Sequence, residues 1–390
     1  MSSAARFDVA VVGAGLVGAS LAAALGRAGL GVALIEPSPP AAPAEAWDSR
    51  IYAISPASSD FLASVDAWGR LDAQRVQAVS RMEIFGDEPD ATLEFSAYDA
   101  GVPTLAFIVE SGRLAHALWE SVARLPSVRR FAPARCERLE LDSGAATLTL
   151  AGGEQLRASL VVGADGAQSW VRRAAGLTAR ASSYRQLGVV ANCGTTRPHD
   201  ATAFQWFRAD GVLAYLPLPG NRISIVWSTP ELPGRDLVGL APGAFLRRVA
   251  EAGRGVLGDL TLITPPQAFP LQSLAAESMI GPRVALVGDA AHVVHPLAGQ
   301  GVNLGFGDAR VLAETLAARE PFRDCGDRVL TRRFERSRAE AVLAMRTVTD
   351  GLARLFGLPG APAARVRNAG LNLTDRLAPV KNLLVRHAIG

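Results

Sequence analysis

The chain has 390 residues and a formal net charge of only +3. This length exceeds that of a single hydrophobic core, so it favours two domains or one large domain with an insertion. Hydrophobic residues make up 49% and charged residues 20%, which predicts an ordered chain, and the small positive excess argues against a nucleic-acid partner. No CxxC spacing occurs, so neither a disulfide framework nor a cysteine metal site is expected. This cysteine usage fits a protein of the reducing cytoplasm. The cysteines are Cys136, Cys193 and Cys325.

The N-terminal segment has the pattern of a βαβ unit. An apolar run over residues 7–12 predicts a buried strand, the Ala- and Leu-rich segment 19–28 a helix, and residues 31–35 a second strand that ends at Glu36. The motif Gly13-Ala-Gly-Leu-Val-Gly18 joins the first strand to the helix. Its glycines allow a tight turn and bring backbone N–H groups to a pyrophosphate, while Glu36 is placed to accept hydrogen bonds from ribose hydroxyls. A dinucleotide site is predicted; the alternative is a tight turn that binds nothing.

The middle of the chain has a different pattern. Strand-like runs over residues 212–218 and 222–228 flank the turn Pro219-Gly220-Asn221, which predicts a hairpin. Neighbouring β-branched and aromatic stretches extend this prediction to a mainly β layer over about residues 179–272. The pattern of a buried parallel strand resumes at residues 283–287.

Two further motifs follow predicted strands. Asp165 lies in an Asp-Gly turn after an apolar run, which by itself indicates only a surface turn. Asp289 ends the next strand, where its carboxylate can accept hydrogen bonds from sugar-like hydroxyls, and a Gly-rich segment then leads to a long helix from about Val302. The dipole at that helix N-terminus favours negative charge on a reduced flavin ring. Beyond about Phe334 the chain is predicted to be mostly helical.

These three motifs, in this order, resemble those of the class A flavoprotein monooxygenases. The segment HPLAGQGVNLGFGDA, residues 295–309, is similar to the branch that hydroxylates ubiquinone precursors, and WDSRIYAISPAS, ESGRLAHALW and FQWF also resemble that branch. The resemblance covers nearly the whole chain. Two departures are the pair Phe306-Gly307, where a bulkier or charged pair is expected, and Phe334, where Tyr is common.

The resemblance implies an α/β fold in which a Rossmann-like FAD/NAD(P)-binding domain carries an inserted, mainly β substrate domain and C-terminal helices. The expected FAD-binding domain is discontinuous and comprises residues 1–72, 103–178 and 273–340. The expected substrate domain comprises residues 73–102 and 179–272. The C-terminal helical region comprises residues 341–390.

The resemblance also implies the cofactor site. Arg50 and Arg113 are expected near the cofactor phosphates or the flavin, Asp165 is linked to both FAD and NAD(P)H, and Asp289 should bind the ribityl or phosphate-linked portion. The residues expected at the cofactor are Gly13, Gly15, Leu16, Val17, Gly18, Glu36, Arg50, Arg113, Asp165, Asp289, Pro296, Gly299, Gly301, Val302 and Asn303. The last five should border the isoalloxazine ring.

Two residues are candidates for a role in catalysis. Pro296 is one, because it is expected beside the flavin. Tyr215 is the other, if it faces the substrate; the alternative is a core tyrosine whose hydroxyl is already bonded. No metal is expected, because His292 and His295 have no third ligand cluster beside them.

In this family NAD(P)H reduces FAD, the reduced flavin reacts with O₂, and the resulting C4a-hydroperoxide transfers one oxygen to an aromatic ring. The expected function is hydroxylation of a polyprenylated phenol or quinone precursor in ubiquinone biosynthesis. One alternative is a different flavoenzyme, either a hydroxylase of a small soluble aromatic or a prenyl reductase. The other is a non-catalytic, FAD-holding scaffold subunit of a biosynthetic complex. A lipid substrate requires an apolar tunnel, whereas a small acid requires an Arg or Tyr clamp.

The C-terminal segment 371–390 mixes apolar side chains with Arg and Lys, a pattern typical of an amphipathic surface. Together with the expected lipid substrate, it predicts a cytoplasmic protein that contacts the membrane peripherally or binds other proteins of ubiquinone biosynthesis.

Overall fold

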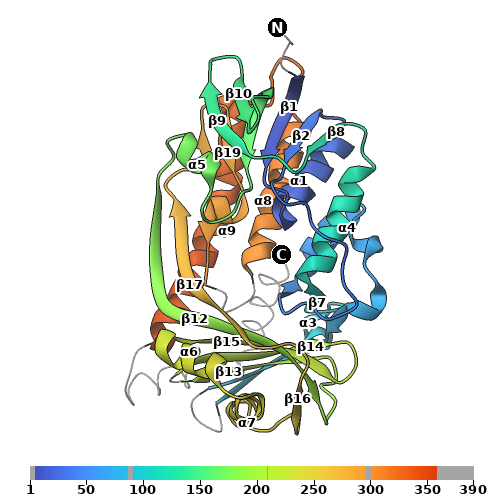
Figure 1. Cartoon of the computed structure of the whole chain (residues 1–390), viewed down its shortest axis with the longest axis vertical. Coiled ribbons are helices and arrows are strands. Elements are labelled where there is room, and N and C mark those ends of the chain that lie inside the picture. Colours follow the sequence, from blue (N-terminus) through green and yellow to red (C-terminus); the bar gives the residue numbers. More distant parts are fainter. Residues whose placement is uncertain (1–4, 87–90, 209, 296–299, 358–390) are drawn as a thin grey trace.

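The computed structural model describes residues 5–86, 91–208, 210–295 and 300–357, without the side chains of 348–350 and 352–357. Two large sheets dominate it. Figure 1 shows the first sheet and helices α1, α4, α8 and α9 in the upper part of the molecule, and the second sheet across the lower part, with α7 beneath it. The predicted α/β class is therefore confirmed.

The first sheet has a parallel centre that contains the N-terminal βαβ unit. Its eight strands run in the order β18 (Ile280–Gly281), β19 (Val284–Leu286), β11 (Gln155–Gly163), β1 (Ala5–Val12), β2 (Val32–Ile35) and β8 (Val128–Phe131), with β10 (Ala146–Leu150) joined to β11 and β9 (Cys136–Leu141) to β10. Strands β2 and β19 are buried along their whole length and β1 from Val9 to Val12, which explains their continuous Val, Ala, Leu and Ile runs.

Helices pack on this sheet and on the elements beside it. They are α1 (Leu16–Arg27), α2 (Pro56–Ser64), α4 (Ser111–Ala123), α5 (Trp170–Ala174), α8 (Gly301–Ala317) and α9 (Arg328–Gly357), together with the short 3₁₀ turns η1 (Trp68–Arg70), η2 (Ala73–Arg75) and η3 (Gly288–Ala290). Helix α1 begins at Leu16, three residues earlier than predicted, because Gly18 lies inside its first turn and not in the preceding loop. Helix α9 likewise begins six residues before Phe334.

The second sheet is mostly antiparallel. Its nine strands run in the order β20 (His292–Val293), β17 (Gln267–Ala276), β12 (Ala179–Thr195), β15 (Arg222–Pro230), β14 (Gly211–Leu218), β13 (Thr202–Arg208), β5 (Arg81–Phe85) and β6 (Thr92–Ser96), with β16 (Leu260–Leu262) joined to β12. The predicted hairpin is confirmed, because β14 and β15 pair antiparallel across residues 219–221. Strands β17 and β20 extend this sheet past residue 272, the expected end of the substrate domain.

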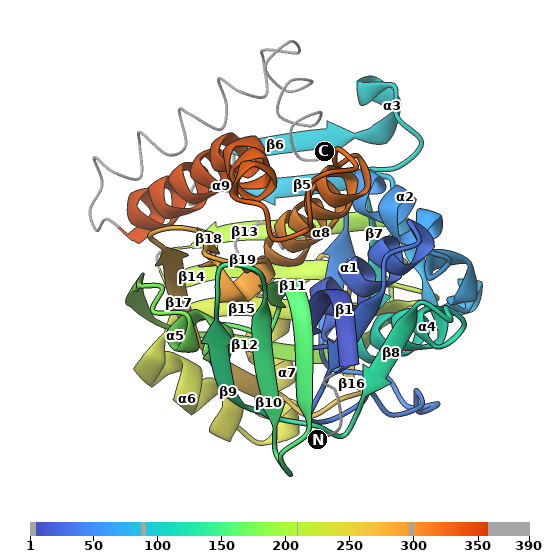
Figure 2. The same ribbon diagram turned by 90° about the horizontal axis from the view of Figure 1, so that it is seen from above.

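The remaining elements are a small third sheet and three helices. The third sheet has the strand order β3 (Ile51–Ile54), β7 (Ala106–Glu110) and β4 (Gln77–Val79). The helices are α3 (Ala97–Ala100), α6 (Glu231–Gly239) and α7 (Pro242–Ala252). Figure 2, seen from above, shows α8 beside α9 and the second sheet beneath the first. No helix within the described ranges is long and apolar enough to cross a membrane.

Candidate functional site

The first part of the candidate site is the glycine turn between β1 and α1. Gly13 has a φ of +98°, and a Cβ on Gly18 would lie 2.0 Å from the Gly13 carbonyl oxygen, so neither position accepts a side chain. Gly15 is the N-cap of α1 and makes no side-chain cap; nothing lies within 4 Å of the place where its Cβ would be. The start of α1 therefore has no side-chain cap and has open space beside Gly15, as an anion site at a helix N-terminus requires.

Glu36 lies at the end of β2, beside this turn. Its Oε2 accepts from the backbone N–H of Ala14 at 2.6 Å and its Oε1 from that of Ser38 at 2.9 Å. The carboxylate is thus fixed next to the glycine turn, and each oxygen retains a lone pair for a hydroxyl. This position agrees with the predicted ribose contact.

Asp165 lies on the other side of the turn. A Cβ on Gly13 would come within 2.9 Å of the Asp165 Cα, so the Asp-Gly motif packs directly on the glycine turn. The Oδ2 of Asp165 accepts from the N–H groups of Trp170 and Val171, at 2.7 and 3.0 Å. Its Oδ1 is buried and has no partner among the described residues. Asp165 therefore fixes the start of α5 and keeps one buried acceptor that no described residue uses.

A second group of residues gathers around Asp289. Solvent reaches the Asp289 side chain, yet surrounding protein raises the pKa of its carboxyl by desolvation, against the opposing charges of His292 and Arg50. Burial likewise raises the pKa of Tyr52, which the nearby charge of Arg50 partly offsets. An accessible carboxylate that protein surrounds on most sides indicates a concave site. Tyr52 escaped notice in the sequence, although it follows Arg50 by two residues on β3.

Asn303 connects this group to the N-terminus of α8. Its Oδ1 accepts from the backbone N–H of Ser55 at 3.0 Å, and its Nδ2 donates to the Ala53 carbonyl at 2.9 Å. Both ends of the amide thus bond to the backbone at the end of β3. Gly301 and Val302 lie in the same first turn of α8, and this helix also has no side-chain N-cap. Pro296 and Gly299 lie outside the described residues.

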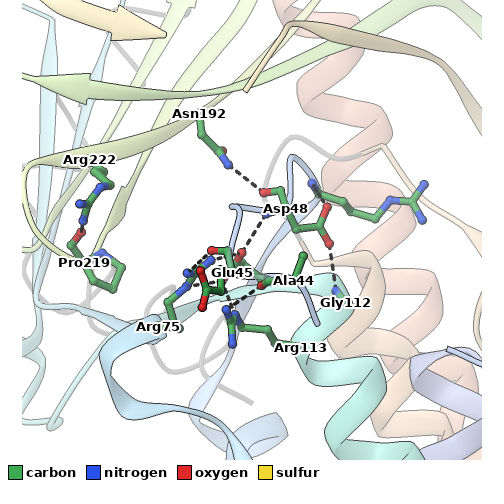
Figure 3. Close-up of polar contacts among 11 residues, drawn as sticks. Ala44, Glu45, Asp48, Arg75, Gly112, Arg113, Asn192, Pro219 and Arg222 are labelled. Carbon is green, nitrogen blue, oxygen red and sulfur yellow. Dashed lines mark hydrogen bonds and ion pairs between the residues drawn. The ribbon is translucent and has the colours of Figure 1, made fainter. Parts of the chain in front are cut away.

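Arg113 holds the loop that carries Arg50. Its guanidinium donates to Glu110 Oε2 at 2.9 Å and to the Ala44 carbonyl at 3.0 Å. Glu110 is only 1% exposed and also binds Arg75. Figure 3 shows Arg75 and Arg113 converging on the loop at Ala44 and Glu45. Arg113 therefore fixes the loop through Nε and Nη2, and its expected contact with the cofactor stays a prediction.

Asp48 connects the same loop to α4 and to the second sheet. Its Oδ2 accepts from the N–H of Gly112 at 3.0 Å, and its backbone carbonyl accepts from Asn192 Nδ2 at 2.7 Å (Figure 3). Asn192 lies on β12, so the face of the second sheet that carries it faces the cofactor side. Near the middle of β12, Gln186 Oε1 lies 3.0 Å from the Nε2 of His295.

The middle of this inner face is apolar and incompletely covered. Ala214 pairs with Val226 across β14 and β15, and Leu216 follows on the same face. All three are only half-buried, although they lie on central strands. Buried Gln205 and Ser224 share this face, and at its edge Arg222 donates to the Pro219 carbonyl and lies over the ring of Trp47. Ala214, Leu216 and Val226 thus form an apolar patch on the face that also carries Asn192.

Tyr215 points the other way. It packs against α7 in the outer cluster, is 1% exposed, and its hydroxyl donates to the Val249 carbonyl at 2.7 Å. Desolvation also raises the pKa of this phenol, so it stays neutral. This geometry argues against the substrate-facing placement of Tyr215 and for the alternative of a core tyrosine, because strand alternation puts odd-numbered β14 residues on the outer face.

The two histidines of the third motif have separate partners. His292 Nε2 lies 2.6 Å from the Oδ2 of Asp308, whereas His295 contacts Gln186 and the ring of Tyr184. The described part of the chain contains no group of three or more His, Cys, Asp and Glu residues that could hold a metal ion. In the sequence, Asp308 is the next-to-last residue of the segment HPLAGQGVNLGFGDA, and no pattern there indicates its contact with His292.

These features fit FAD. The uncapped N-terminus of α1 and the open space at Gly15 suit the pyrophosphate, and Glu36 suits the adenosine ribose. The accessible Asp289 suits hydroxyls of the ribityl chain, and the uncapped N-terminus of α8 suits a flavin ring that gains negative charge.

The comparisons with known proteins agree with this geometry. The model of the FAD binding domain family matches residues 6–347. A ubiquinone hydroxylase, UbiL, from Rhodospirillum rubrum is 36% identical over 98% of this chain and 89% of its own length. The 3-demethoxyubiquinol 3-hydroxylase of Escherichia coli is 33% identical over 98% of both chains.

Solved structures show the same fold. That of PqsL, a probable FAD-dependent monooxygenase from Pseudomonas aeruginosa, superposes with a TM-score of 0.79 at 24% identity, over 95% of this chain and 100% of that chain. The p-nitrophenol 4-monooxygenase PnpA from Pseudomonas putida gives a TM-score of 0.80 at 19% identity, over 99% of both chains. At these identities the likeness extends to the fold alone.

Proposed function

Because the chain belongs to the FAD binding domain family, we propose that it is an FAD-dependent monooxygenase that hydroxylates a polyprenylated phenol or quinone precursor in ubiquinone biosynthesis. NAD(P)H and O₂ are its co-substrates. The names of the relatives from Rhodospirillum rubrum and Escherichia coli support the reaction class, and their similarity extends over nearly the whole chain.

The observation that carries the substrate class is the apolar inner face of the second sheet. Ala214, Leu216 and Val226 are half-buried there and face the cofactor side. A small aromatic acid would need a cation or a Tyr hydroxyl to bind its carboxylate. Arg222 of β15 lies at the edge of this face, but its guanidinium already donates to the Pro219 carbonyl and lies over Trp47, and the Tyr215 hydroxyl lies on the other face. This favours an apolar, lipid-like aromatic substrate over a small soluble acid.

The roles that we assign to the cofactor residues follow from their positions. The turn at Gly13, Gly15 and Gly18 holds the pyrophosphate against α1, and Glu36 binds the ribose. Asp289 binds the ribityl portion, with Arg50 balancing its charge. When bound, FAD supplies the two-electron reduction and the activation of O₂ that the protein side chains cannot provide.

The chain itself positions the ring and excludes water. Glu110, Arg75 and Arg113 fix the loop that carries Arg50, and Asn303 fixes the first turn of α8. The apolar face then desolvates the aromatic ring, which strengthens every electrostatic interaction in the closed site.

An anaerobic titration with NAD(P)H, followed by aeration with a short-chain prenylphenol and mass analysis, tests this function. We expect a yellow protein whose flavin is reduced and a product heavier by one oxygen. Flavin that stays oxidised with every donor and substrate would instead support a non-catalytic FAD-holding scaffold.

A variant locates the substrate. Ala214→Leu should fill the inner face and lower turnover of the prenylphenol at least about tenfold, because overpacking excludes a bound ring, while FAD binding stays unchanged. Ala339→Leu, the same change at an exposed position of α9, serves as the control. Equal activity of both variants would contradict the proposed substrate face.

Peripheral contact with the membrane or with other proteins of ubiquinone biosynthesis is also part of the proposal. It is supported by the amphipathic pattern of residues 371–390, which lie outside the described residues. Deletion of this segment should abolish sedimentation with liposomes or capture of partners; unchanged binding would refute the idea.

A further inference from the structure

A fully buried carboxylate connects three segments behind the cofactor site. Asp308 on α8 is 0% exposed, and its Oδ2 accepts from the backbone N–H of Gly288 at 2.9 Å and contacts His292. Its Oδ1 accepts from Arg338 Nε at 2.7 Å. Arg338 comes from α9, which lies beside α8 in both views (Figures 1 and 2). A single ion-paired carboxylate thus ties α9 to the turn that precedes Asp289.

Arg338 also reaches the N-terminal part of α8. Its Nη2 donates to the Leu304 carbonyl at 3.0 Å, and Leu304 follows Asn303 in the first turns of that helix. Arg338 is 7% exposed and His292 3%, so the whole cluster is shielded from solvent. In such surroundings a charge that loses its partner costs several kcal/mol, so the arrangement is tightly specified.

Gly307 makes the path of Arg338 possible. A Cβ at this position would lie 2.8 Å from Arg338 Nη2 and 3.1 Å from its Cζ. The guanidinium therefore crosses α8 where only a hydrogen atom projects from the helix. This explains physically why Gly307 stands where the sequence comparison led us to expect a bulkier or charged residue.

The turn that Asp308 holds is constrained from the other side as well. Gly288 has a φ of +58°, and a Cβ there would lie 3.2 Å from the side chain of Val17, on α1. A Cβ on Gly305 would lie 2.6 Å from the same side chain. The turn is thus pinned between α1 and Asp308, and any shift of Asp308 must move Asp289.

We propose that Arg338 is a positioning residue for the cofactor: through Asp308 and the Leu304 carbonyl, it fixes both the Gly288–Asp289 turn and the N-terminus of α8. Helix α9, which no nucleotide-binding motif includes, then sets the affinity and the redox potential of the flavin. The inference rests on the proposed placement of FAD against Asp289 and α8.

The test displaces Arg338 without deleting a charge. Gly307→Ala should push the guanidinium off Asp308, raise the dissociation constant for FAD roughly five- to tenfold, and shift the midpoint potential of the bound flavin to a more negative value. The potential falls because the N-terminus of α8 no longer stabilises the reduced flavin as well. Gly243→Ala is the matched control, since its Cβ would meet an arginine, Arg247, only at an ordinary 3.7 Å.

A double-variant cycle isolates the path. If Gly307 matters only because Arg338 crosses it, Gly307→Ala should add nothing to the effect of Arg338→Ala. An equal effect of Gly307→Ala in both backgrounds would overturn the proposal. Should Gly307→Ala fail to fold, Arg338→Lys replaces it, because lysine keeps the charge but lacks the two separate donors that Asp308 and Leu304 require.

The midpoint potential of the bound flavin distinguishes a positioning role of Arg338 from a merely structural one. A variant that melts earlier but, at saturating FAD, keeps the wild-type affinity and midpoint potential would overturn the inference. Failure of the proposed function looks different, because the wild-type protein itself would then bind no FAD, or would bind FAD that NAD(P)H does not reduce. Wild-type binding with insensitive variants therefore contradicts this inference alone.

Discussion

The two glycine-rich turns of the cofactor site are built in different ways. The turn at Gly13 to Gly18 is local, because its strand, its helix and Glu36 all come from one βαβ unit. The turn at Gly288 is held by distant groups: Asp308 and Arg338 on one side and Val17 on the other. The difference teaches that a local turn can be recognised from its own residues, whereas a distributed turn depends on the packing of separate helices.

The largest expected effect concerns the distributed turn. Asp308→Asn should lower the free energy of unfolding of the apoprotein at pH 7 by roughly 3–5 kcal/mol, because it leaves Arg338 buried without its anion. Urea unfolding measures the change. A loss below about 1 kcal/mol would show that the second turn does not depend on this carboxylate.

That effect has a pH dependence with a defined sign. Desolvation opposes ionisation of Asp308, but His292, Arg338 and the Gly288 N–H outweigh it and lower the pKa of the carboxyl below its usual 3.8. A lowered pKa contributes stability that is present above 3.8 and lost as the pH falls through the folded value. The difference in the free energy of unfolding between wild type and Asp308→Asn should therefore shrink only at acid pH.

The next effect separates two glycines of the local turn. Gly18→Ala should destabilise the apoprotein by roughly 2–3 kcal/mol, because its Cβ meets the Gly13 carbonyl and overpacks the turn. Gly15→Ala should leave apoprotein stability within about 0.5 kcal/mol and weaken FAD binding alone, since its Cβ meets only open space. Thermal unfolding and flavin titration give the two readouts. Equal stability losses in both variants would contradict the open space beside Gly15.

A smaller effect tests the outer face of the second sheet. Tyr215→Phe removes the hydrogen bond to the Val249 carbonyl and should cost about 1 kcal/mol of stability. Turnover of the prenylphenol should stay at the wild-type level, because the hydroxyl lies away from the cofactor side. A large fall in turnover with unchanged stability would return Tyr215 to the list of catalytic candidates.

The smallest effect has the opposite sign to that of Asp308. Desolvation raises the pKa of Asp289, so its folded state favours the protonated form; the resulting stability is complete below 3.8 and is lost as the pH rises through the folded value. Asp289→Asn should therefore stabilise the apoprotein at pH 7, by less than about 1 kcal/mol because solvent reaches the side chain. The gain should vanish at acid pH, and FAD should bind more weakly.

The sequence by itself determined the βαβ unit, the hairpin of β14 and β15 and the α/β class. These features arise from periodicity and turn residues that lie close together in the chain, such as Pro219-Gly220-Asn221 and the glycines before α1. The resemblance of the motifs likewise identified the FAD-dependent family, which the match over residues 6–347 confirms.

Only the tertiary structure decided what distant side chains do. It showed that Arg113 holds the loop at Ala44, that Tyr215 faces α7, and that Arg338 reaches Asp308 across Gly307. None of these pairings has a signature in the sequence, because each partner is selected by how separately folded elements pack. The physical reason is the cost of burying a charge or a hydroxyl without a partner, which the assembled fold must meet and no single segment can.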